Sequence, residues 1–410
     1  MDNEKSYLHS FAEKCRDELL GNIMPFWMEH GLDRVHGGVY TCLDRDGTLM
    51  DSTKSVWFQG RFAYILSHAY NHVEKNHEWL TAAKSTIEFF ERHCFDPRGK
   101  MYFEVAADGT PLRMRRYLFS ECFAAMAMAE YAFAMRPSRQ RDPTVRRSRG
   151  DRPTDAAEQY AGKAVTLFKR ILSFMGDPAI TPPKYEPTMA SQDHSLTMIL
   201  INVAMTLKQV SDDPALDAQI DESIDRLVRF FIHPEFKCVL ETVGPNGEFI
   251  DTCAGRTINP GHAIETSWFL MDVAKARGDR ALLEKALQVL DWSWEWGWDG
   301  NFGGGGIISF RDCRNFPPQR YEQDMKFWWP QCEAIIANRE AYLLTGERRY
   351  FDHFRLAAEW AWTRLKDPEF PEWFGYLHRD GTVAQTAKGN IFKGPFHIPR
   401  MLIRTGTFLV

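Results

Sequence analysis

The chain has 410 residues, of which 44% are hydrophobic and 13% aromatic, so it can bury a large core. Its formal net charge of −5, and the lack of any apolar run of about 18 residues, give no basis for binding nucleic acid or crossing a membrane. Eight scattered cysteines without a Cys-x-x-Cys pair, and an N-terminus unlike a secretory signal, lead us to expect reduced thiols and a cytoplasmic location.

Apolar residues recur with a period of about 3.6 residues along some twelve stretches, which predicts a mainly helical chain. The predicted helices span residues 5–29, 54–74, 78–94, 117–135, 155–175, 190–210, 215–232, 261–277, 280–297, 326–345, 348–365 and 397–407. Between several of them lie β-forming runs that end in Asp-Gly or Asn-Gly, and this pattern predicts hairpins. The hairpin segments include residues 38–47, 102–109, 238–247 and 374–381.

The helices and hairpins form an internal repeat. A polar residue stands near the head of every second helix, at intervals of 60–73 residues: Arg61, Glu121, His194, Glu265, Glu333 and His397. Units of this size cannot bury their apolar faces alone, so we expect them to close into a ring. The prediction is an all-α fold, an (α/α)6 barrel whose polar helix heads meet in a cleft at the hairpin end. No linker interrupts the repeat, so residues 1–410 are predicted to form one domain, with a surface insertion at 136–154.

The first predicted inner helix carries an arginine between aromatic residues. Trp57, Arg61 and Tyr64 are spaced i, i+4 and i+7, which places them on one stripe of the helix. An inward-facing arginine is costly to bury unless it meets an anion or a carboxylate. Arg61 is therefore either part of a ligand site or half of a structural salt bridge.

The second and third inner helices begin with polar side chains whose purpose is open from sequence. Tyr117 and Glu121 share a helix face, and either can hydrogen-bond a sugar or satisfy polar groups in the core. His194 is by itself typical of a buried core histidine, but its place in the repeat makes it a candidate for the cleft.

Two histidines stand at helix starts marked by proline, His262 after Asn-Pro-Gly and His397 before Ile-Pro-Arg. The positive end of a helix disfavours imidazolium, so both are expected to be neutral near pH 7. Glu265 and Glu333, on the faces of their own helices, are expected to orient the two rings or to offset their protonated forms. Two facing acid/base groups are what inversion of a C–H centre requires. Metal binding is a competing interpretation, but no compact His-Glu-x-x-His motif is present, so no metal is predicted.

Motifs along nearly the whole chain point to one family. They are Phe-Trp at 26–27 with His-Gly-Gly at 36–38, Val-Trp-Phe-Gln-Gly-Arg at 56–61, Asn-Pro-Gly-His-Ala-Ile-Glu at 259–265, Lys-Phe-Trp-Trp-Pro-Gln-Cys-Glu at 326–333, Glu-Trp-Phe-Gly-Tyr-Leu at 372–377 and Lys-Gly-Pro-Phe-His-Ile-Pro-Arg at 393–400. Together they resemble the N-acylglucosamine 2-epimerase family, also known as renin-binding proteins, whose fold is an (α/α)6 barrel.

The resemblance implies interconversion of an aldose and its 2-epimer through the open-chain sugar and a cis-enediolate. His262 and His397 match the family's acid/base pair, and Arg61, His194, Glu265 and Glu333 match residues that line the same pocket. Arg61 is expected to stabilise the developing oxyanion. The remaining candidates for contact with the sugar are Trp57, Tyr117, Trp329 and Phe392.

The wording of the motifs is closer to the N-acylglucosamine branch than to the cellobiose branch, where a tryptophan tends to stand at the position of Phe392. N-Acetylglucosamine and N-acetylmannosamine are therefore the expected substrates. The resemblance also implies no required cofactor, possible activation by ATP and a possible homodimer.

Four alternatives stay open at this point. The protein is an epimerase for free mannose or glucose or for a cellobiose-type disaccharide, an aldose–ketose isomerase, a glycoside hydrolase that uses Glu265 and Glu333, or a non-catalytic binding protein. A hydrolase leaves both histidines without a purpose, and a binding protein leaves the whole acid/base set without one.

Overall fold

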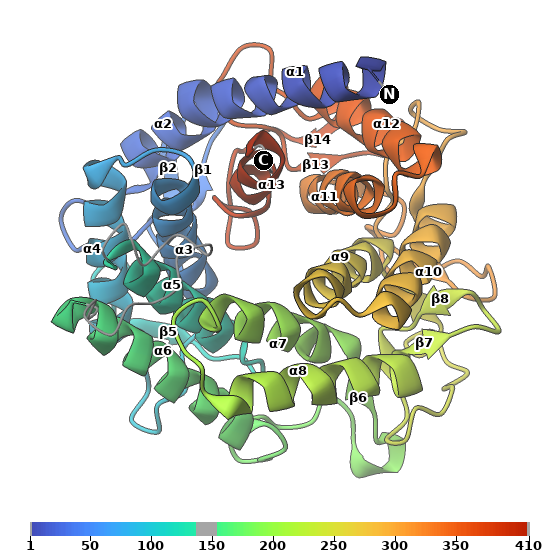
Figure 1. Cartoon of the computed structure of the whole chain (residues 1–410). Helices are drawn as coiled ribbons and strands as arrows, with labels where there is room; N and C mark the ends of the chain where they lie inside the picture. The colour runs from blue at the N-terminus through green and yellow to red at the C-terminus, as the bar shows by residue number, and fades with distance from the viewer. Residues whose placement is uncertain (1, 137–153, 408–410) are drawn as a thin grey trace.

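A computed structural model describes residues 2–136 and 154–407, which form a closed ring of paired helices (Figure 1). Within this part of the chain the inner ring consists of α3 (Val56–His72), α5 (Phe119–Ala134), α7 (His194–Leu207), α9 (Pro260–Arg277), α11 (Trp328–Thr345) and α13 (His397–Gly406). The outer helices are α1 (Asp2–Glu18), α4 (His77–His93), α6 (Asp155–Phe174), α8 (Pro214–Arg226), α10 (Arg280–Gly297) and α12 (Arg348–Arg364). The predicted (α/α)6 barrel is confirmed.

Several helix boundaries differ from the prediction, since Lys54–Ser55 and Lys326–Phe327 are strands and Leu227–Phe231 is a π-helical turn. The helix expected over 5–29 is α1 followed by π-helical turns at Leu19–Ile23 and Trp27–Gly31, which flank the short α2 (Met24–Phe26). Pro25 lacks a backbone N–H, so the regular α ladder cannot run through this region. The helix expected over 190–210 begins only at His194, because Gln192 and Asp193 pair as a strand. Residues 137–153, almost all of the predicted surface insertion, lie outside the described residues, and the one-domain prediction stays a prediction.

Small residues let the inner helices pack closely. The α5 sequence alternates alanine with methionine and aromatic residues, and nearly all of it is buried. Gly60 of α3 faces the α5 backbone, where an added Cβ would lie 2.6 Å from the carbonyl carbon of Phe123. A side chain at position 60 would therefore push α3 and α5 apart at the level where Arg61 leaves the helix.

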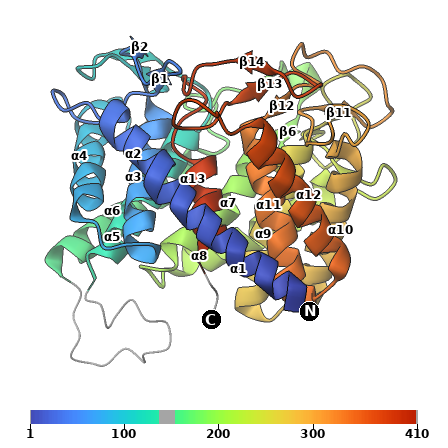
Figure 2. The same ribbon diagram turned by 90° about the horizontal axis from the view of Figure 1, so that it is seen from above.

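Short antiparallel sheets cover one end of the ring (Figure 2). In four units the strand that leads into an inner helix pairs with a hairpin strand that follows the next outer helix. These pairs are β3 (Lys54–Ser55) with β4 (Glu104–Val105), β6 (Gln192–Asp193) with β9 (Thr242–Val243), β10 (Thr257–Ile258) with β11 (Arg311–Asp312), and β12 (Lys326–Phe327) with β13 (Tyr376–Leu377). The strands β5 (Pro111–Arg113) and β14 (Val383–Gln385) complete two of the sheets, and β1 (Cys42–Leu43) with β2 (Leu49–Asp51) and β7 (Ile232–His233) with β8 (Cys238–Val239) form separate hairpins. The heads of α3, α7, α9 and α11 are thereby each held next to a strand that follows the neighbouring outer helix.

Some polar residues near the helix heads tie the hairpin end together. Glu121 Oε1 accepts a hydrogen bond of 2.7 Å from the Met101 backbone N–H. Gln331 at the head of α11 likewise accepts from the Ile307 N–H at 2.7 Å and donates to the Ile307 carbonyl at 2.8 Å. Burial raises the pKa of Glu121 to about 7, although the Met101 bond opposes this shift. Of the two purposes left open for Glu121, the structure therefore supports the satisfaction of core polar groups.

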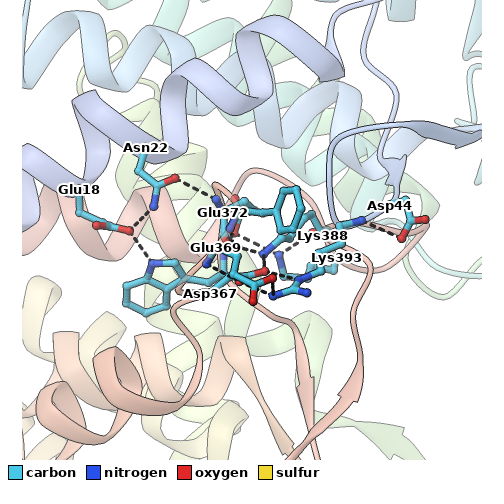
Figure 3. A network of polar contacts seen from close by, with 11 residues as sticks. Glu18, Asn22, Asp44, Asp367, Glu369, Glu372, Lys388 and Lys393 are labelled. Atoms are coloured by element: carbon cyan, nitrogen blue, oxygen red, sulfur yellow. Dashed lines mark hydrogen bonds and ion pairs between the residues drawn. The ribbon is translucent and has the colours of Figure 1, made fainter.

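The last long loop is fixed to the N-terminal helices by a buried polar network (Figure 3). Lys388 Nζ lies 2.6 Å from Asp367 Oδ2, and Lys393 Nζ lies 3.2 Å from Glu372 Oε1. The Glu372 N–H donates to Asn22 Oδ1 at 2.9 Å, which ties the loop to the start of the chain. Both lysines are buried, and buried charges persist only when they are paired and hydrogen-bonded. The network holds the segment that leads into α13.

The eight cysteines all fall within the described residues and are unpaired, as expected. None of the helices that the structure describes is both long and apolar enough to span a bilayer.

Candidate active site

A cavity of about 850 Å³ lies at the hairpin end of the ring, bounded by the inner helix heads and the loops. Most of the predicted site residues line it: Trp57, Arg61, Tyr117, His262, Glu265, Trp329, Phe392 and His397. The other two predicted residues, His194 and Glu333, are fully buried and contact groups behind the lining. The residues predicted for the site therefore lie together at the hairpin end of the barrel.

The start of α9 positions His262. Asn259 caps the helix by accepting a hydrogen bond of 3.2 Å from the His262 backbone N–H, and Pro260 supplies a fixed φ at the first helical position. Gly261 is required by close packing, because a Cβ there would lie 2.6 Å from the Trp329 ring. The Asn-Pro-Gly-His motif therefore sets His262 against Trp329, with 5.2 Å between the two ring centroids.

Glu241 is the carboxylate partner of His262, and the sequence analysis gave it no role. Its Oε2 lies 2.9 Å from His262 Nδ1, and its Oε1 lies 3.3 Å from His194 Nδ1. His194 Nε2 in turn lies 3.0 Å from Thr266 Oγ1 on α9. His194 thus supports Glu241 from behind the cavity, which differs from the sugar contact that was expected of it. Glu241 could have been identified from sequence, because it is a charged residue within the mainly apolar segment Cys-Val-Leu-Glu-Thr.

The His262 ring is paired with Glu241 instead of Glu265, so of the two roles expected of Glu265, orienting the ring or offsetting its protonated form, the structure supports the second. Glu265 accepts a hydrogen bond of 2.5 Å from Arg400 Nη2, and it influences His262 through its charge alone. Positions i and i+3 share a helix face, but the segment that carries Glu241 brings a carboxylate to 2.9 Å from the imidazole. Contacts between distant segments decided this pairing.

The surroundings of His262 shift its pKa upward, which is opposite to the direction expected from its position at a helix start. Burial by itself lowers its pKa, but the Glu241 carboxylate at 2.9 Å outweighs burial and raises the pKa of His262 above its usual value. Glu265 adds to the rise through its charge. The helix N-terminus, on which the expectation rested, is a weaker influence than a carboxylate in direct contact.

His397, the first residue of α13, has the opposite electrostatic environment. Its Nδ1 lies 2.8 Å from Glu333 Oε1, as predicted, and 3.3 Å from Arg400 Nη2. Burial lowers the pKa of His397 well below its usual value, and the positive charges of Arg400 and Arg61 lower it further. His397 is therefore neutral near pH 7, as expected.

Arg400, one helical turn after His397, joins the carboxylates of two inner helices. Its Nη2 donates to Glu265 Oε1 at 2.5 Å and to Glu333 Oε1 at 2.7 Å, and Glu333 Oε2 accepts a further bond of 2.8 Å from Trp268 Nε1. The guanidinium is buried, and these carboxylates raise its pKa despite burial. Sequence reasoning missed Arg400, although its i+3 spacing from His397 puts it on the same helix face. Glu265 and Glu333 are thus engaged with one cation, which leaves them unsuited to act as the separate acid and nucleophile of a glycoside hydrolase.

Arg61 projects into the cavity among aromatic rings. Its guanidinium carbon lies 4.1 Å from the Phe123 centroid and 4.7 Å from the Phe396 centroid. Its Nε is buried and has no hydrogen-bond partner among the described residues. Burial lowers the pKa of Arg61 to about 9, which leaves the side chain positively charged at neutral pH. A buried, unpaired cation at the cavity wall is arranged to receive a negatively charged oxygen of a ligand.

Aromatic side chains shape the rest of the cavity. The indole of Trp329 lies between the two histidines, 5.2 Å from the His262 ring and 5.7 Å from the His397 ring. Phe392 stands at the mouth with 43% of its surface exposed. Apolar surface with a few convergent polar groups is typical of a site for a small polar molecule.

Two groups of side chains in and behind the cavity have the composition of metal ligands: His194, Glu241 and His262 form one, and Glu265, Glu333 and His397 form the other. In the second group the Arg400 guanidinium already supplies the cation. In the first, the histidine–carboxylate pairs account for the contacts. That the active site requires no metal stays a prediction.

The chain as a whole is similar to known carbohydrate epimerases. A family model described as N-acylglucosamine 2-epimerase (GlcNAc 2-epimerase) matches residues 38–394. The N-acylglucosamine 2-epimerase of Bos taurus is 35% identical, covering 98% of this chain and 92% of the relative. A cellobiose 2-epimerase of Bacteroides fragilis is 23% identical, covering 95% of this chain and 97% of the relative. The solved structure of cellobiose 2-epimerase from Spirochaeta thermophila superposes with a TM-score of 0.79 at 20% identity, covering 98% of this chain and 96% of that one.

Proposed function

Because this chain belongs to the N-acylglucosamine 2-epimerase family, we propose that it interconverts N-acetylglucosamine and N-acetylmannosamine with His262 and His397 as the acid/base pair. The chain is a carbohydrate 2-epimerase, an isomerase that acts on a small sugar. The higher identity to relatives named N-acylglucosamine 2-epimerase than to those named cellobiose 2-epimerase supports the choice of N-acetylated substrates.

The opposite pKa shifts of the two histidines carry the proposal. Two titratable groups whose environments push their pKa values apart are suited to act as base and acid in one step. Burial and two arginines lower the pKa of His397 well below its usual value, whereas Glu241 raises the pKa of His262 above its usual value. In each ring Nδ1 faces a carboxylate, which leaves Nε2 for the substrate.

The proton balance of the proposed reaction is complete without a cofactor. The C1 aldehyde of the open-chain sugar acidifies the C2 proton, which His397 Nε2 removes from one face to give a cis-enediolate. His262 Nε2 then returns a proton to C2 from the other face, and the C1 carbonyl reforms as the 2-epimer. For the opposite epimer the two histidines exchange their parts. Solvent protons restore the resting forms between turnovers.

Arg61 is the proposed partner of the enediolate oxygen. Its guanidinium lines the cavity and retains a buried N–H without a hydrogen-bond acceptor in the described part of the chain. A preorganised donor aimed at a developing oxyanion typically contributes about 3–4 kcal/mol to transition-state stabilisation. Because the site is fixed by aromatic contacts to Phe123 and Phe396, little reorganisation accompanies the reaction.

Deuterium incorporation tests the proposed function. With N-acetylglucosamine or N-acetylmannosamine in D2O, the product epimer should carry deuterium at C2 from the first turnovers, while the recovered substrate keeps its proton. The product differs from the recovered substrate because one histidine removes the C2 proton and the other histidine, which has exchanged with D2O, donates the new one. Proton NMR with chromatography of the sugars measures both. No C2 exchange with either N-acetylated sugar refutes the substrate assignment, and a ketose product identifies an aldose–ketose isomerase instead.

The Glu241→Gln variant tests the part of His262. The Glu241 charge raises the pKa of His262, so its loss lowers that pKa and His262 loses its proton at a lower pH. The alkaline limb of the kcat/KM profile, measured with the epimer that His262 protonates, should therefore move to lower pH. The acidic limb, which reports His397, should stay in place. An unchanged alkaline limb in a folded Glu241→Gln enzyme contradicts the assignment of His262 as the acid.

A further inference from the structure

A second histidine–carboxylate group lies outside the proposed active site. His68 and His72 are one turn apart near the C-terminal end of α3, and Glu130 lies near the C-terminal end of α5. Because α3 and α5 begin at the hairpin end with Arg61 and Glu121 near their heads, their C-terminal ends lie at the opposite end of the barrel (Figure 2). None of the epimerase chemistry uses these residues.

The three side chains converge on one point. His68 Nδ1 lies 3.0 Å from Glu130 Oε1, His72 Nε2 lies 3.5 Å from the same oxygen, and all three ligand-type atoms lie within 4.8 Å of one another. Zinc–ligand bonds of about 2.0–2.1 Å in a tetrahedron place neighbouring ligand atoms roughly 3.3 Å apart. The two observed distances from Glu130 Oε1 to the histidine nitrogens, 3.0 and 3.5 Å, lie on either side of this ligand–ligand separation, so a small shift of the side chains would admit an ion.

Hydrogen bonding alone leaves part of this cluster unexplained. Glu130 is fully buried, and its Oε1 is shared by His68 and by Asn71 Nδ2, which donates at 2.9 Å. Its Oε2 is also buried, yet within the described residues it has no hydrogen-bond partner. A buried carboxylate oxygen without a partner carries a cost that a bound cation removes.

The neighbouring cation does not fill this place. Arg404 of α13 influences His68 through its charge, but its two Nη atoms each lie 2.9 Å from the carboxylate of Asp272. Its charge is therefore largely satisfied by another inner helix. The cluster keeps one open side, because His72 is 38% exposed, and a water ligand can reach an ion from that direction.

We propose that His68, His72 and Glu130 form a binding site for a divalent transition metal of the zinc type. Two imidazoles and one carboxylate are a ligand set that zinc favours, and the fourth position is left to water. The ion would join α3 to α5, two adjacent inner helices, at the end of the barrel away from the sugar. Its expected effect is on stability, because a ligand that binds only the folded chain raises the melting temperature.

Zinc titration of the full-length, chelator-treated protein tests the proposal. Equilibrium dialysis with elemental analysis should find a site that binds Zn²⁺ and raises the melting temperature, and Co²⁺ at the same site should give the absorption bands of a tetrahedral complex. The His262→Ala variant should keep this site, since a zinc ion held by the His194, Glu241 and His262 group would be lost there.

Two variants of the cluster and one control decide the outcome. His72→Ala removes a half-exposed ligand, and Glu130→Gln keeps the shape and the contacts of the side chain while removing its charge. Each should weaken Zn²⁺ binding by more than about tenfold and abolish the melting-temperature rise, while epimerase activity stays at the wild-type level. His77→Ala replaces an exposed histidine at the start of α4, at the same end of the barrel, and should bind Zn²⁺ like the wild type.

Zinc binding and stabilisation that persist unchanged in His72→Ala and Glu130→Gln overturn the proposal. So does the absence of a zinc-dependent rise in the wild-type melting temperature. Because the measured quantities are metal content, Co²⁺ spectrum and melting temperature, neither result depends on whether the epimerase assignment is correct.

Discussion

Replacing His397 by alanine should lower kcat/KM for epimerisation by about 10²–10⁴-fold at pH 7, the usual contribution of one general acid/base group. The neutral imidazole is the base of the resting enzyme, and the buried Glu333 that orients it cannot take its place because it lies behind the cavity lining. The measurement is initial-rate epimerisation of both N-acetylated sugars. His262→Ala should reduce the rate by a similar factor.

The two variants should differ in how they exchange the C2 proton with D2O. In His262→Ala, His397 can still remove and return the proton on its own face, so one epimer should take up deuterium without inversion. In His397→Ala the other epimer should exchange, again without inversion. This crossed pattern follows only if the two histidines face opposite sides of C2. Loss of both exchange reactions in one variant would assign both proton transfers to the histidine replaced in that variant and contradict the pair.

A histidine away from the cavity provides the control. His378 is exposed on the loop between β13 and β14, so His378→Ala should epimerise like the wild type. Circular dichroism and melting temperature establish that the two active-site variants are folded. Full activity in a folded His262→Ala or His397→Ala enzyme removes that residue from the mechanism.

The sequence predicted those features that depend on local pattern. Apolar periodicity located the helices, Asp-Gly and Asn-Gly located hairpins, and the spacing of polar helix heads predicted the ring. The Asn-Pro-Gly-His motif placed His262 correctly because capping by Asn259 and close packing at Gly261 are properties of one short segment. These are the features for which the deciding interactions lie within a few residues of each other.

Pairings between distant segments were the features that sequence could not supply. Glu241 and His262 are 21 residues apart, and Arg400 and Glu265 are 135 apart, so neither pairing follows from helix periodicity. The consequence is largest for the protonation states. His262 and His397 have the same local setting, a helix start, and were expected to behave alike. Each ring has a carboxylate partner, but burial together with the charges of Arg400 and Arg61 lowers the pKa of His397, whereas Glu241 outweighs burial and raises the pKa of His262.

Loss of Arg400 should destabilise the fold strongly. Replacing it by methionine preserves much of its apolar contact with Trp268 and Phe396 but leaves Glu265 and Glu333 buried without their shared cation. Breaking a buried ion pair by removing one partner typically costs about 3–5 kcal/mol, so Arg400→Met should lower the free energy of unfolding by that amount. Urea denaturation at neutral pH measures the difference.

The same substitution should also change how activity depends on pH. The positive charge of Arg400 contributes to the low pKa of His397, so removing it raises that pKa, and the base becomes protonated at a higher pH. The acidic limb of kcat/KM should therefore move to higher pH in Arg400→Met, and less so in Arg400→Lys, which keeps the charge. Arg404→Met is the matched control. Arg404 lies on the same helix as Arg400, and its loss breaks a partly exposed ion pair with Asp272 of α9, so the acidic limb should stay unchanged. An unshifted limb in a folded Arg400→Met enzyme would mean that burial alone keeps His397 neutral, and that Arg400 serves the fold without setting the protonation state of the base.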